Sequence, residues 1–229
     1  MNNPLVSIIM PTLNAGKYIG EALLSVQNQK YKNYEIILVD GGSTDNTISV
    51  SRQFHGIKLI KQTGIGLFDA WNCGINSASG DLIAFLDSDD KFEENCIENH
   101  IKLYQENTLV TCTIGHMEFF IQQNQAPPPE FKTSLLNRPH LAYMPGCFFG
   151  RRDVFRRVGL FETQWKIASD IVWFAKLKRS AEQIGIIDQV VLKKRVHQEN
   201  LLYTTARTPV YDSELLRFLH NSIKNNLPT

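Results

Sequence analysis

The stretch Leu82-Ile83-Ala84-Phe85-Leu86-Asp87-Ser88-Asp89-Asp90 places three aspartates directly after an apolar segment that has the character of a buried strand. Neighbouring carboxylates repel one another, and at roughly 4–6 Å with an effective dielectric near 20 each pair costs about 3–4 kcal/mol. Since the run contains no Lys or Arg, a divalent cation with oxygen ligands is the natural source of an offsetting charge. A solvated, Asp-rich turn is the alternative, and the run alone does not decide between the two.

Other short apolar runs occur upstream of this stretch, at Val6–Met10, Glu35–Val39 and Ile57–Ile60. Runs that are almost continuously apolar are typical of strands in parallel sheets with helices on both faces. The segments between the runs have helical spacing and cover residues 17–29, 45–54 and 67–77. The alternation predicts a βαβ series, and therefore an α/β fold with an open, mostly parallel, twisted sheet and right-handed crossovers.

Local signals indicate where two of these helices begin or end. Ser43 and Thr44 precede the second helix and are candidate N-caps, because their hydroxyls can accept hydrogen bonds from free backbone N–H groups. Gly80 follows the third helix and is a candidate C-terminal stop.

The second half of the chain has a less regular pattern. Its predicted strands or extended segments are Leu109–Gly115, Met117–Ile121 and Ile184–Leu192, its predicted helices are Asp153–Val158, Ser169–Arg179 and Ser213–Asn225, and residues 122–130 with three prolines form a predicted loop. The last predicted helix has an apolar stripe that packs on the domain or on a dimer partner, with contact to a membrane surface as a lesser alternative. No repeat or low-complexity linker divides the chain, which favours a single domain.

Composition excludes several classes of protein. The 229 residues have a formal net charge of +1, which gives no electrostatic reason to expect nucleic acid binding. The four cysteines are scattered without a CxxC pair, which argues against zinc and disulfides and favours reduced thiols in the cytosol. The N-terminus does not resemble a signal peptide. No apolar run approaches the roughly 20 residues needed to cross a bilayer.

Three polar segments directly follow predicted strands: Pro11–Asn14, Asp40–Ser43 and Asp87–Asp90. Because parallel strands end at the same edge of a sheet, and ligands bind along that edge, we expect the three segments to meet in one crevice.

The order and spacing of these motifs resemble those of family 2 glycosyltransferases, which have the GT-A fold. The resemblance is carried by Val6–Asn14, Ile37–Asp45, Gly66–Ile75, Ala78–Asp81, Phe85–Asp90, Phe148–Phe161 and Ala168–Asp170. It implies one GT-A domain over residues 1–229, with a Rossmann-like nucleotide-sugar-binding half at 1–115. The acceptor-binding half and C-terminal helix would then occupy residues 116–229.

The resemblance implies where the nucleotide lies. Asp40 matches the aspartate that accepts the uracil N–H in family members that use UDP-sugars, and a carboxylate suits such a donor edge. The backbone of Pro11 and Thr12 would line the base pocket, with Asn14 nearby. Without a ligand, Asp40 would instead be the partner of a helix N-terminus, and residues 11–14 would be a plain turn.

Other positions are implied to contact the diphosphate and sugar. Asp69 and Asn72 resemble helix residues that face this part of the donor, although they could equally cap or solvate their helix. Ser88, between two of the aspartates, is counted with the nucleotide-sugar-binding residues. Asp87 would bond the ribose or reach a metal ion through water.

The resemblance also implies a metal site. Asp87 and Asp89 match the DxD motif, and alternate residues of an extended segment face the same way. Asp89 would ligate Mg²⁺ or Mn²⁺, which uses one or two protein carboxylates together with substrate phosphates. Asp90 would support the ligands, and His197 resembles a late histidine near the metal and diphosphate. A lone histidine is also a common structural residue.

Asp170 is the candidate catalytic base. It begins a predicted helix, where an acidic residue can also simply complement the helix dipole. In the family this aspartate often follows another acidic residue, whereas here the preceding residue is Ser169. A carboxylate in this position would take the proton of the acceptor hydroxyl.

The implied activity is metal-dependent transfer of a sugar, with inversion, from a nucleotide-sugar to an acceptor hydroxyl. A UDP-sugar donor, a glycan or lipid-linked glycan acceptor, and a role in bacterial surface polysaccharide synthesis follow by analogy. We expect a cytoplasmic protein without a membrane span, in a setting compatible with peripheral contact at the inner face of the cell membrane and with a homodimer. The alternatives are a catalytically inactive sugar-nucleotide-binding scaffold and a nucleotidyltransferase.

Overall fold

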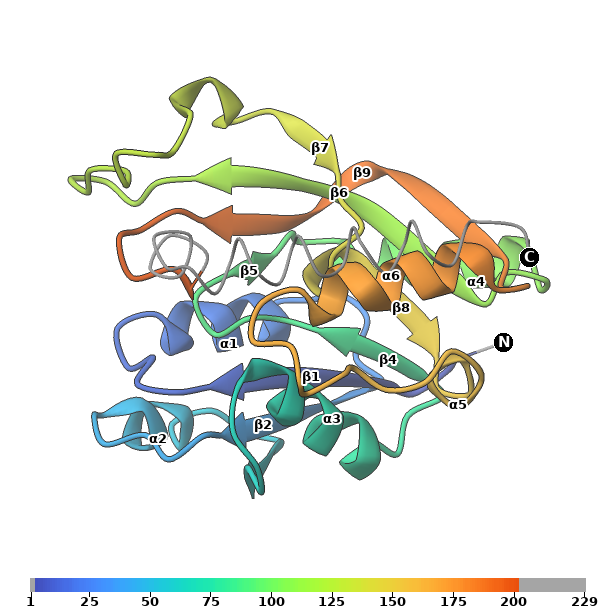
Figure 1. Cartoon of the computed structure of the whole chain (residues 1–229), viewed down its shortest axis with the longest axis horizontal. Helices are drawn as coiled ribbons and strands as arrows, with labels where there is room; N and C mark the ends of the chain where they lie inside the picture. The colour runs from blue at the N-terminus through green and yellow to red at the C-terminus, as the bar shows by residue number, and fades with distance from the viewer. Residues whose placement is uncertain (1–2, 202–229) are drawn as a thin grey trace.

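The computed structural model describes residues 3–201, and the predicted helix Ser213–Asn225 lies outside the described residues (Figure 1). Strands and helices alternate in the first half as predicted. The elements are β1 (Val6–Thr12), α1 (Ile19–Gln27), β2 (Tyr34–Asp40), α2 (Thr47–Ser51), β3 (Ile57–Lys61), α3 (Leu67–Ser77) and β4 (Leu82–Phe85).

The described part of the second half adds strands of very different lengths and three α-helices. Its elements are β5 (Lys91–Phe92), α4 (Cys96–Glu106), β6 (Cys112–Phe120), the 3₁₀ turns η1 (Thr133–Leu135) and η2 (Pro145–Cys147), β7 (Pro139–Leu141), β8 (Phe148–Arg151), α5 (Val154–Arg157), α6 (Ser169–Arg179) and β9 (Ile184–Arg195). Among the described residues, no helix is both long enough and apolar enough to cross a membrane.

One sheet runs through the described chain in the order β3-β2-β1-β4-β8-β6-β9-β5, with β7 paired to β6. Strands β1 to β4 are mutually parallel, and β8 is antiparallel to both β4 and β6. Because β9 is parallel to β6, β6 and β9 point the same way as β1 to β4. The predicted α/β fold with a mostly parallel sheet is therefore confirmed, and β5, β7 and β8 run in the opposite direction.

The core lies on both faces of the sheet. Along β1, Ile8 and Met10 pack on one face with α1 and α4, whereas Ile9 packs on the other face with α3 and α6. An aromatic cluster dominates the second face and includes Trp71, Phe85, Phe148, Phe155, Phe161 and Trp173. Each large side chain buried there contributes about 1.5–3 kcal/mol. The sheet is thus packed with apolar side chains on both of its faces.

Two predictions of helix ends were wrong. The N-cap position of α2 is Asn46, and neither Ser43 nor Thr44 caps it. Ser43 instead donates its hydroxyl hydrogen bond to Asp40. Helix α3 ends at Ser77, ahead of Gly80, whose α-carbon lies so close to the backbone of Leu5 and Ser7 that a Cβ would meet them at 2.7 Å. Gly80 therefore allows close approach of two chain segments and does not end a helix.

The second half was predicted less well. The two strands expected within residues 109–121 form the single strand β6, whose register on β9 is irregular around Gly115 and His116. A Cβ at Gly115 would collide with Val191, so the glycine allows the two strands to stay in contact there. Helix α4 and strands β5, β7 and β8 were not among the predicted elements.

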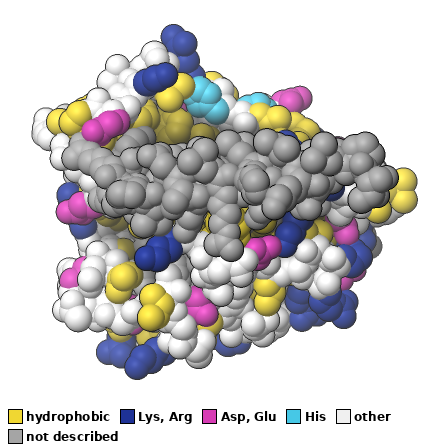
Figure 2. Space-filling view, viewed as in Figure 1, with side chains coloured by type: hydrophobic (Ala, Val, Ile, Leu, Met, Phe, Trp, Pro, Cys, Tyr) yellow, Lys and Arg dark blue, Asp and Glu magenta, His cyan; other side chains and the backbone are white. Residues whose placement is uncertain are grey.

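Figure 2 shows Lys and Arg side chains gathered at the lower right, in the region of α5, which carries Arg156 and Arg157 in its last turn.

Candidate functional site

The carboxyl ends of the parallel strands bring the site together. Residues 11–14 and 40–43 begin within the last residues of β1 and β2, and residues 87–90 follow β4, so the three predicted segments share one edge of the sheet. Strand β9 ends at the same edge, because it runs parallel to β6 in the same sheet. The segment after β9, residues 196–200, therefore joins the crevice, although it is more than a hundred residues from the acidic run.

Asp87, Asp89 and Asp90 form a compact acidic triad. Each offers a carboxylate oxygen within 4.8 Å of the others. The turn is closed by the backbone N–H of Asp90, which donates to the carbonyl of Asp87 at 3.1 Å. Asp90 is 1% exposed, and its carboxylate accepts hydrogen bonds from the backbone N–H of Arg195 at 2.8 Å and from Lys194 Nζ at 2.9 Å.

Lys194 lies against the triad and supplies a positive charge that the acidic run lacks. Its Nζ is also 3.7 Å from Asp87 Oδ2. Burial lowers the pKa of the Lys194 ammonium, but the negative charges of Asp90, Asp87 and Asp89 outweigh burial and the pKa is raised. The expected divalent cation is therefore not the sole source of offsetting charge, because Lys194 supplies part of it.

The three carboxyls of the triad have different affinities for protons. Burial raises the pKa of Asp90 to about 7 despite the nearby charge of Lys194. Burial also raises the pKa of Asp87, and the neighbouring Asp89 adds to that rise. For Asp89 burial acts upward as well, but the hydrogen bond from His197 and the charge of Lys194 outweigh it, so the pKa is lowered. Asp89 is thus the carboxyl of the three that is most readily ionised.

His197 lies against Asp89. Its Nε2 is 2.9 Å from Asp89 Oδ2, and Asn200 Nδ2 donates to the same oxygen at 3.0 Å. His197 is 6% exposed, and its imidazole packs against the ring of Tyr18, with 4.6 Å between ring centroids. A hollow of about 270 Å³ opens beside His197, between Lys17 and Gln125.

Arg195 connects the acidic run to neighbouring elements of the fold. Its side chain is fully buried between the rings of Tyr18 and Phe120, at 4.9 and 4.8 Å from their centroids. Its Nε donates to the carbonyl of Asp89 at 2.8 Å. The other guanidinium nitrogens donate to Gln122 at 2.8 Å and to Glu21 at 3.0 Å. This single residue therefore ties the acidic run to α1 and to the end of β6.

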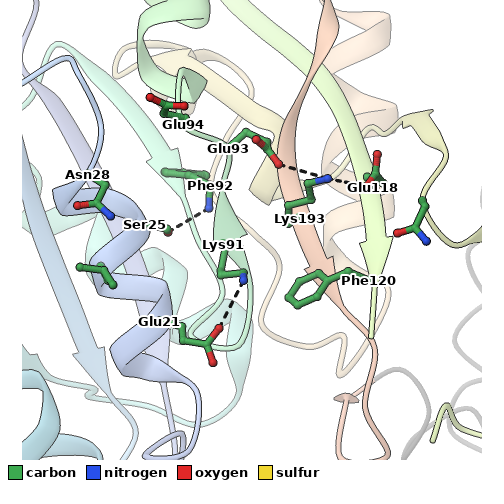
Figure 3. A pocket seen from close by; sticks show the side chains of 12 residues that line it. Glu21, Ser25, Asn28, Lys91, Phe92, Glu93, Glu94, Glu118, Phe120 and Lys193 are labelled. Atoms are coloured by element: carbon green, nitrogen blue, oxygen red, sulfur yellow. Dashed lines mark hydrogen bonds and ion pairs between the residues drawn. The ribbon is translucent and has the colours of Figure 1, made fainter. Parts of the chain in front are cut away.

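Behind Glu21 lies a groove of about 520 Å³ lined by ion pairs (Figure 3). Glu21 also pairs with Lys91 at 3.4 Å, and Lys193 lies between Glu118 and Glu93. These pairs join α1, β5, β6 and β9. They hold β5, which begins one residue after the triad, against its neighbours.

Asp170, the predicted catalytic base, lies in the first turn of α6. Its Oδ1 accepts a hydrogen bond from the backbone N–H of Ile171 at 2.9 Å. Burial raises the pKa of its carboxyl to about 6, and the charge of Asp87 adds to the rise. The protonation of Asp170 is therefore influenced by the charge of the triad. Among the described residues, the buried Ser169 hydroxyl beside it has no hydrogen-bond partner.

The residues predicted to hold the nucleotide base lie in two interlocked loops. Asp40 accepts hydrogen bonds from the backbone N–H groups of Gly42 and Ser43 and from the Ser43 hydroxyl. Asn14 has a φ of 50°, and its Oδ1 accepts from the Thr44 N–H at 2.9 Å. The Asn14 N–H in turn donates to Ser43 Oγ at 3.0 Å. Asp40 and Asn14 therefore shape the loops that follow β1 and β2.

The other predicted donor residues have varied surroundings. Pro11 and Thr12 are buried in β1, and the Thr12 hydroxyl has no hydrogen-bond partner within residues 3–201. Asp69 accepts from the Gly64 N–H at 2.9 Å and from Gln62 at 3.1 Å, so it braces the loop before α3. The Asn72 amide exchanges hydrogen bonds with the backbone of Phe161 at 2.8 and 3.0 Å, which links α3 to the second half.

Sequence reasoning missed several residues of this site: Glu21, Lys194, Arg195 and Asn200. The signal that could have found the last three is the segment Lys193–Asn200, which concentrates basic and amide side chains directly after a predicted strand. Its strand partner could not be known from the sequence.

The donor set fits a divalent cation. Carboxylates are the oxygen ligands that Mg²⁺ and Mn²⁺ prefer, and one or two of them suffice when substrate phosphates complete the coordination. The triad offers three within 4.8 Å. His197 lies on the carboxylate oxygen of Asp89 and could add an imidazole nitrogen. The identity of the ion is not fixed by this arrangement.

Comparisons with known proteins point to one family. Residues 7–159 match the family model described as "Glycosyl transferase family 2". The chain is 33% identical over 211 residues to an uncharacterized glycosyltransferase of Rickettsia typhi, covering 85% of this chain and 65% of that protein. It is 40% identical over 107 residues to glycosyltransferase GlyG of Streptococcus pneumoniae, covering 44% of this chain and 35% of GlyG. The chain thus spans less than two thirds of the length of these curated relatives.

Solved structures show the same fold. TarS 1-349 of S. aureus in complex with UDP-GlcNAc superimposes with a TM-score of 0.75 at 21% identity, covering 97% of this chain and 68% of that one. The same protein in complex with UDP has a TM-score of 0.68 at 22% identity, covering 85% of this chain and 61% of that one. At this level of identity the likeness concerns the fold.

Proposed function

The chain belongs to glycosyl transferase family 2, and on that premise we propose that it is a metal-dependent, inverting glycosyltransferase. It would move a sugar from a nucleotide-sugar to an acceptor hydroxyl. The observation that carries the proposal is the contact between Asp89 and His197 at the edge of the sheet where the acidic run and the end of β9 converge. The proposal adds Asp170, at the start of α6, whose carboxyl is influenced by the charge of Asp87.

The donor is proposed to be a UDP-sugar. Asp40 would accept the uracil N–H, and the loops shaped by Asp40 and Asn14 would hold the base above Pro11 and Thr12. The unpartnered, buried Thr12 hydroxyl supports a polar ligand at this place. The S. aureus TarS structures contain UDP and UDP-GlcNAc on the same fold, which supports the choice of nucleotide.

The diphosphate would lie beside the triad. Asp89, Asp87 and His197 would hold Mn²⁺ or Mg²⁺ there, with Ser88, Asp69 and Asn72 bordering the sugar. When bound, such an ion supplies Lewis-acid stabilisation of negative charge on the departing diphosphate. Arg195 and Asn200 keep the Asp89 carboxylate in place through its backbone carbonyl and its Oδ2. The protein thus orients its ligand atoms before the donor arrives.

Asp170 would act as the catalytic base. A pKa near 6 leaves the carboxylate ionised at neutral pH and still basic enough to take a proton from an attacking hydroxyl. The hydroxyl oxygen then bonds to the anomeric carbon as the bond from that carbon to the diphosphate breaks. A single displacement of this kind inverts the anomeric configuration.

The setting of the reaction is proposed by analogy with the family. The acceptor would be a glycan or a lipid-linked glycan in surface polysaccharide synthesis. The protein would act in the cytoplasm, in peripheral contact with the inner face of the cell membrane, as one GT-A domain that is able to form a homodimer.

The test is product analysis with the purified protein, a panel of nucleotide-sugars and Mn²⁺. We expect nucleoside diphosphate to be released from one donor, and Asp170→Asn to reduce this release by at least about a hundredfold. Release of pyrophosphate in a parallel assay with a nucleoside triphosphate and a sugar 1-phosphate would instead identify a nucleotidyltransferase. Donor binding without any turnover, over a panel of glycan and lipid-linked acceptors, would identify a binding scaffold.

A further inference from the structure

Lys194 brings a fixed positive charge into the acidic triad. Its Nζ lies 2.9 Å from Asp90 Oδ2 and 3.7 Å from Asp87 Oδ2. These two contacts span 104 and 107 positions of the chain, so they exist because β9 ends at the same edge as β4. The ammonium therefore occupies the region where three carboxylates could also hold a divalent ion.

The strand geometry fixes which lysine faces the triad. Successive side chains of a strand point to opposite faces, and Lys193 lies in the groove of Figure 3 between Glu118 and Glu93. Lys194 therefore points the other way, to the triad. Strand pairing with Phe119 and the hydrogen bond from the next backbone N–H to Asp90 hold the main chain on either side.

The Lys194 side chain is held but still reachable. It is 24% exposed, whereas the Asp90 side chain beneath it is 1% exposed. Asp87, on its other side, is 28% exposed. The side chain thus contacts a buried carboxylate on one side and a partly exposed one on the other, and about a quarter of its surface stays accessible to a second anionic group.

We propose that Lys194 is a built-in counter-ion of the triad, which competes with the divalent ion for the carboxylates and contacts the diphosphate of the donor. This inference rests on the proposed function, because it assumes that a nucleoside diphosphate binds at this edge. Lys194 would thus weaken the binding of the metal ion and strengthen the binding of the nucleotide.

The opposite signs follow from charge alone. A positive charge within about 4 Å of the same carboxylates repels a divalent cation, so Lys194 weakens metal binding. The same charge attracts the phosphates, so Lys194 strengthens nucleotide binding when no metal is present. A residue that merely keeps the loop folded would, on removal, weaken both kinds of binding.

The test uses Lys194→Met, which keeps most of the side-chain length and removes the charge, together with Lys194→Arg, which keeps the charge. The matched control is Lys193→Met, on the same strand, which removes a lysine that also pairs with two carboxylates but lies in the groove behind the triad. Binding of Mn²⁺ alone is followed by the electron paramagnetic resonance signal of the free ion. Binding of UDP in EDTA is followed by calorimetry.

We expect Lys194→Met to bind Mn²⁺ about tenfold more tightly and metal-free UDP about tenfold more weakly than the wild type. Lys194→Arg and Lys193→Met should stay within about twofold of the wild type in both titrations. Weaker binding of both Mn²⁺ and UDP by Lys194→Met, or no change in either, would overturn the inference. A wild type that binds neither Mn²⁺ nor UDP would overturn the proposed function first, and the inference with it.

A second pair of variants tests the inference if Lys194→Met alone does not fold. Removal of Lys194 leaves the buried Asp90 carboxylate without its ammonium partner, which can destabilise the protein. In Asp90→Asn this carboxylate is absent, so Asp90→Asn and the double variant Asp90→Asn/Lys194→Met form a second comparison. The double variant should again bind Mn²⁺ more tightly and metal-free UDP more weakly than Asp90→Asn. The same direction of change for both ligands would contradict the inference.

Discussion

The acidic run at residues 87–90 and the basic segment at residues 194–200 meet at one edge of the sheet, but they are held in different ways. The acidic run is a short turn whose charges repel one another. Much of its stabilisation comes from Lys194 and Arg195 of the basic segment. The basic segment is anchored by Arg195, which is buried between two aromatic rings and bound to Glu21. The positions of the carboxylates in the acidic run therefore depend on how firmly the basic segment is packed.

The largest expected effect separates chemistry from binding. Asp170→Asn should lower kcat/KM by about 10²–10⁴, because the carboxylate that accepts the proton is lost. UDP binding should remain near the wild-type level, since Asp170 lies on α6 and outside the triad. Steady-state kinetics and calorimetry on the same sample measure both. A variant that turns over at the wild-type rate would show that Asp170 is not the base.

The next effect measures how firmly the basic segment holds the acidic run. Arg195→Met should lower the free energy of unfolding by about 2–5 kcal/mol, because it leaves the Asp89 carbonyl and the Gln122 side chain without their donor. It also removes the buried partner of the half-exposed Glu21. Urea denaturation measures the loss, with Lys193→Met as a control in the neighbouring position. A loss below about 1 kcal/mol for Arg195→Met would mean that the acidic run is held without it.

A pH profile tests the site of the proposed base directly. Since burial raises the pKa of Asp170 to about 6, log kcat/KM should rise with pH up to about 6 with a slope of about one, and then level off. The same group should act on stability in the opposite direction. Between the ordinary pKa of 3.8 and the raised value near 6 the native state binds more protons, so the unfolding free energy falls as pH rises.

Asp170→Asn is the control for both pH readings, because it removes the titrating group. Its residual activity should lose the inflection near pH 6, and its stability should lose this part of the pH dependence. An unchanged inflection in the variant would assign the titration to another group.

The smallest effect is expected in the groove of Figure 3. Glu118→Gln removes one partner of Lys193, which keeps Glu93 at 3.3 Å. Partly exposed pairs of this kind contribute about 0–1 kcal/mol, so the unfolding free energy and the affinity for UDP should stay close to the wild type. A large loss of UDP binding would mean that the groove takes part in the donor site.

The acidic side of the site could be predicted from the sequence because its signals are local. Asp87 and Asp89 directly follow a predicted strand, and the strand order brings the ends of β1, β2 and β4 together by the rules of parallel sheets. The prediction for Ser43 was wrong because it also relied on a local signal alone. A hydroxyl just before a helix looks like a cap, but Asp40 and Asn14 bind it first.

The basic side could not be predicted in the same way, because its partners are distant in the chain. Arg195 and Asp90 are separated by 105 positions, and their pairing depends on the irregular strand β6 and on the antiparallel strand β8. Neither feature has a strong local signal. Lys194 was overlooked because only the acidic run itself was searched for an offsetting charge.

The most direct test of the central claim, that the acidic run and the basic segment together form a metal-dependent donor site, is calorimetric titration of UDP with Mn²⁺ and again with EDTA. Wild-type protein should bind UDP about tenfold or more tightly with Mn²⁺, and Asp89→Asn should lose this gain while remaining folded. Equal affinity of the wild type in Mn²⁺ and in EDTA, or no binding of UDP in either, would contradict the account.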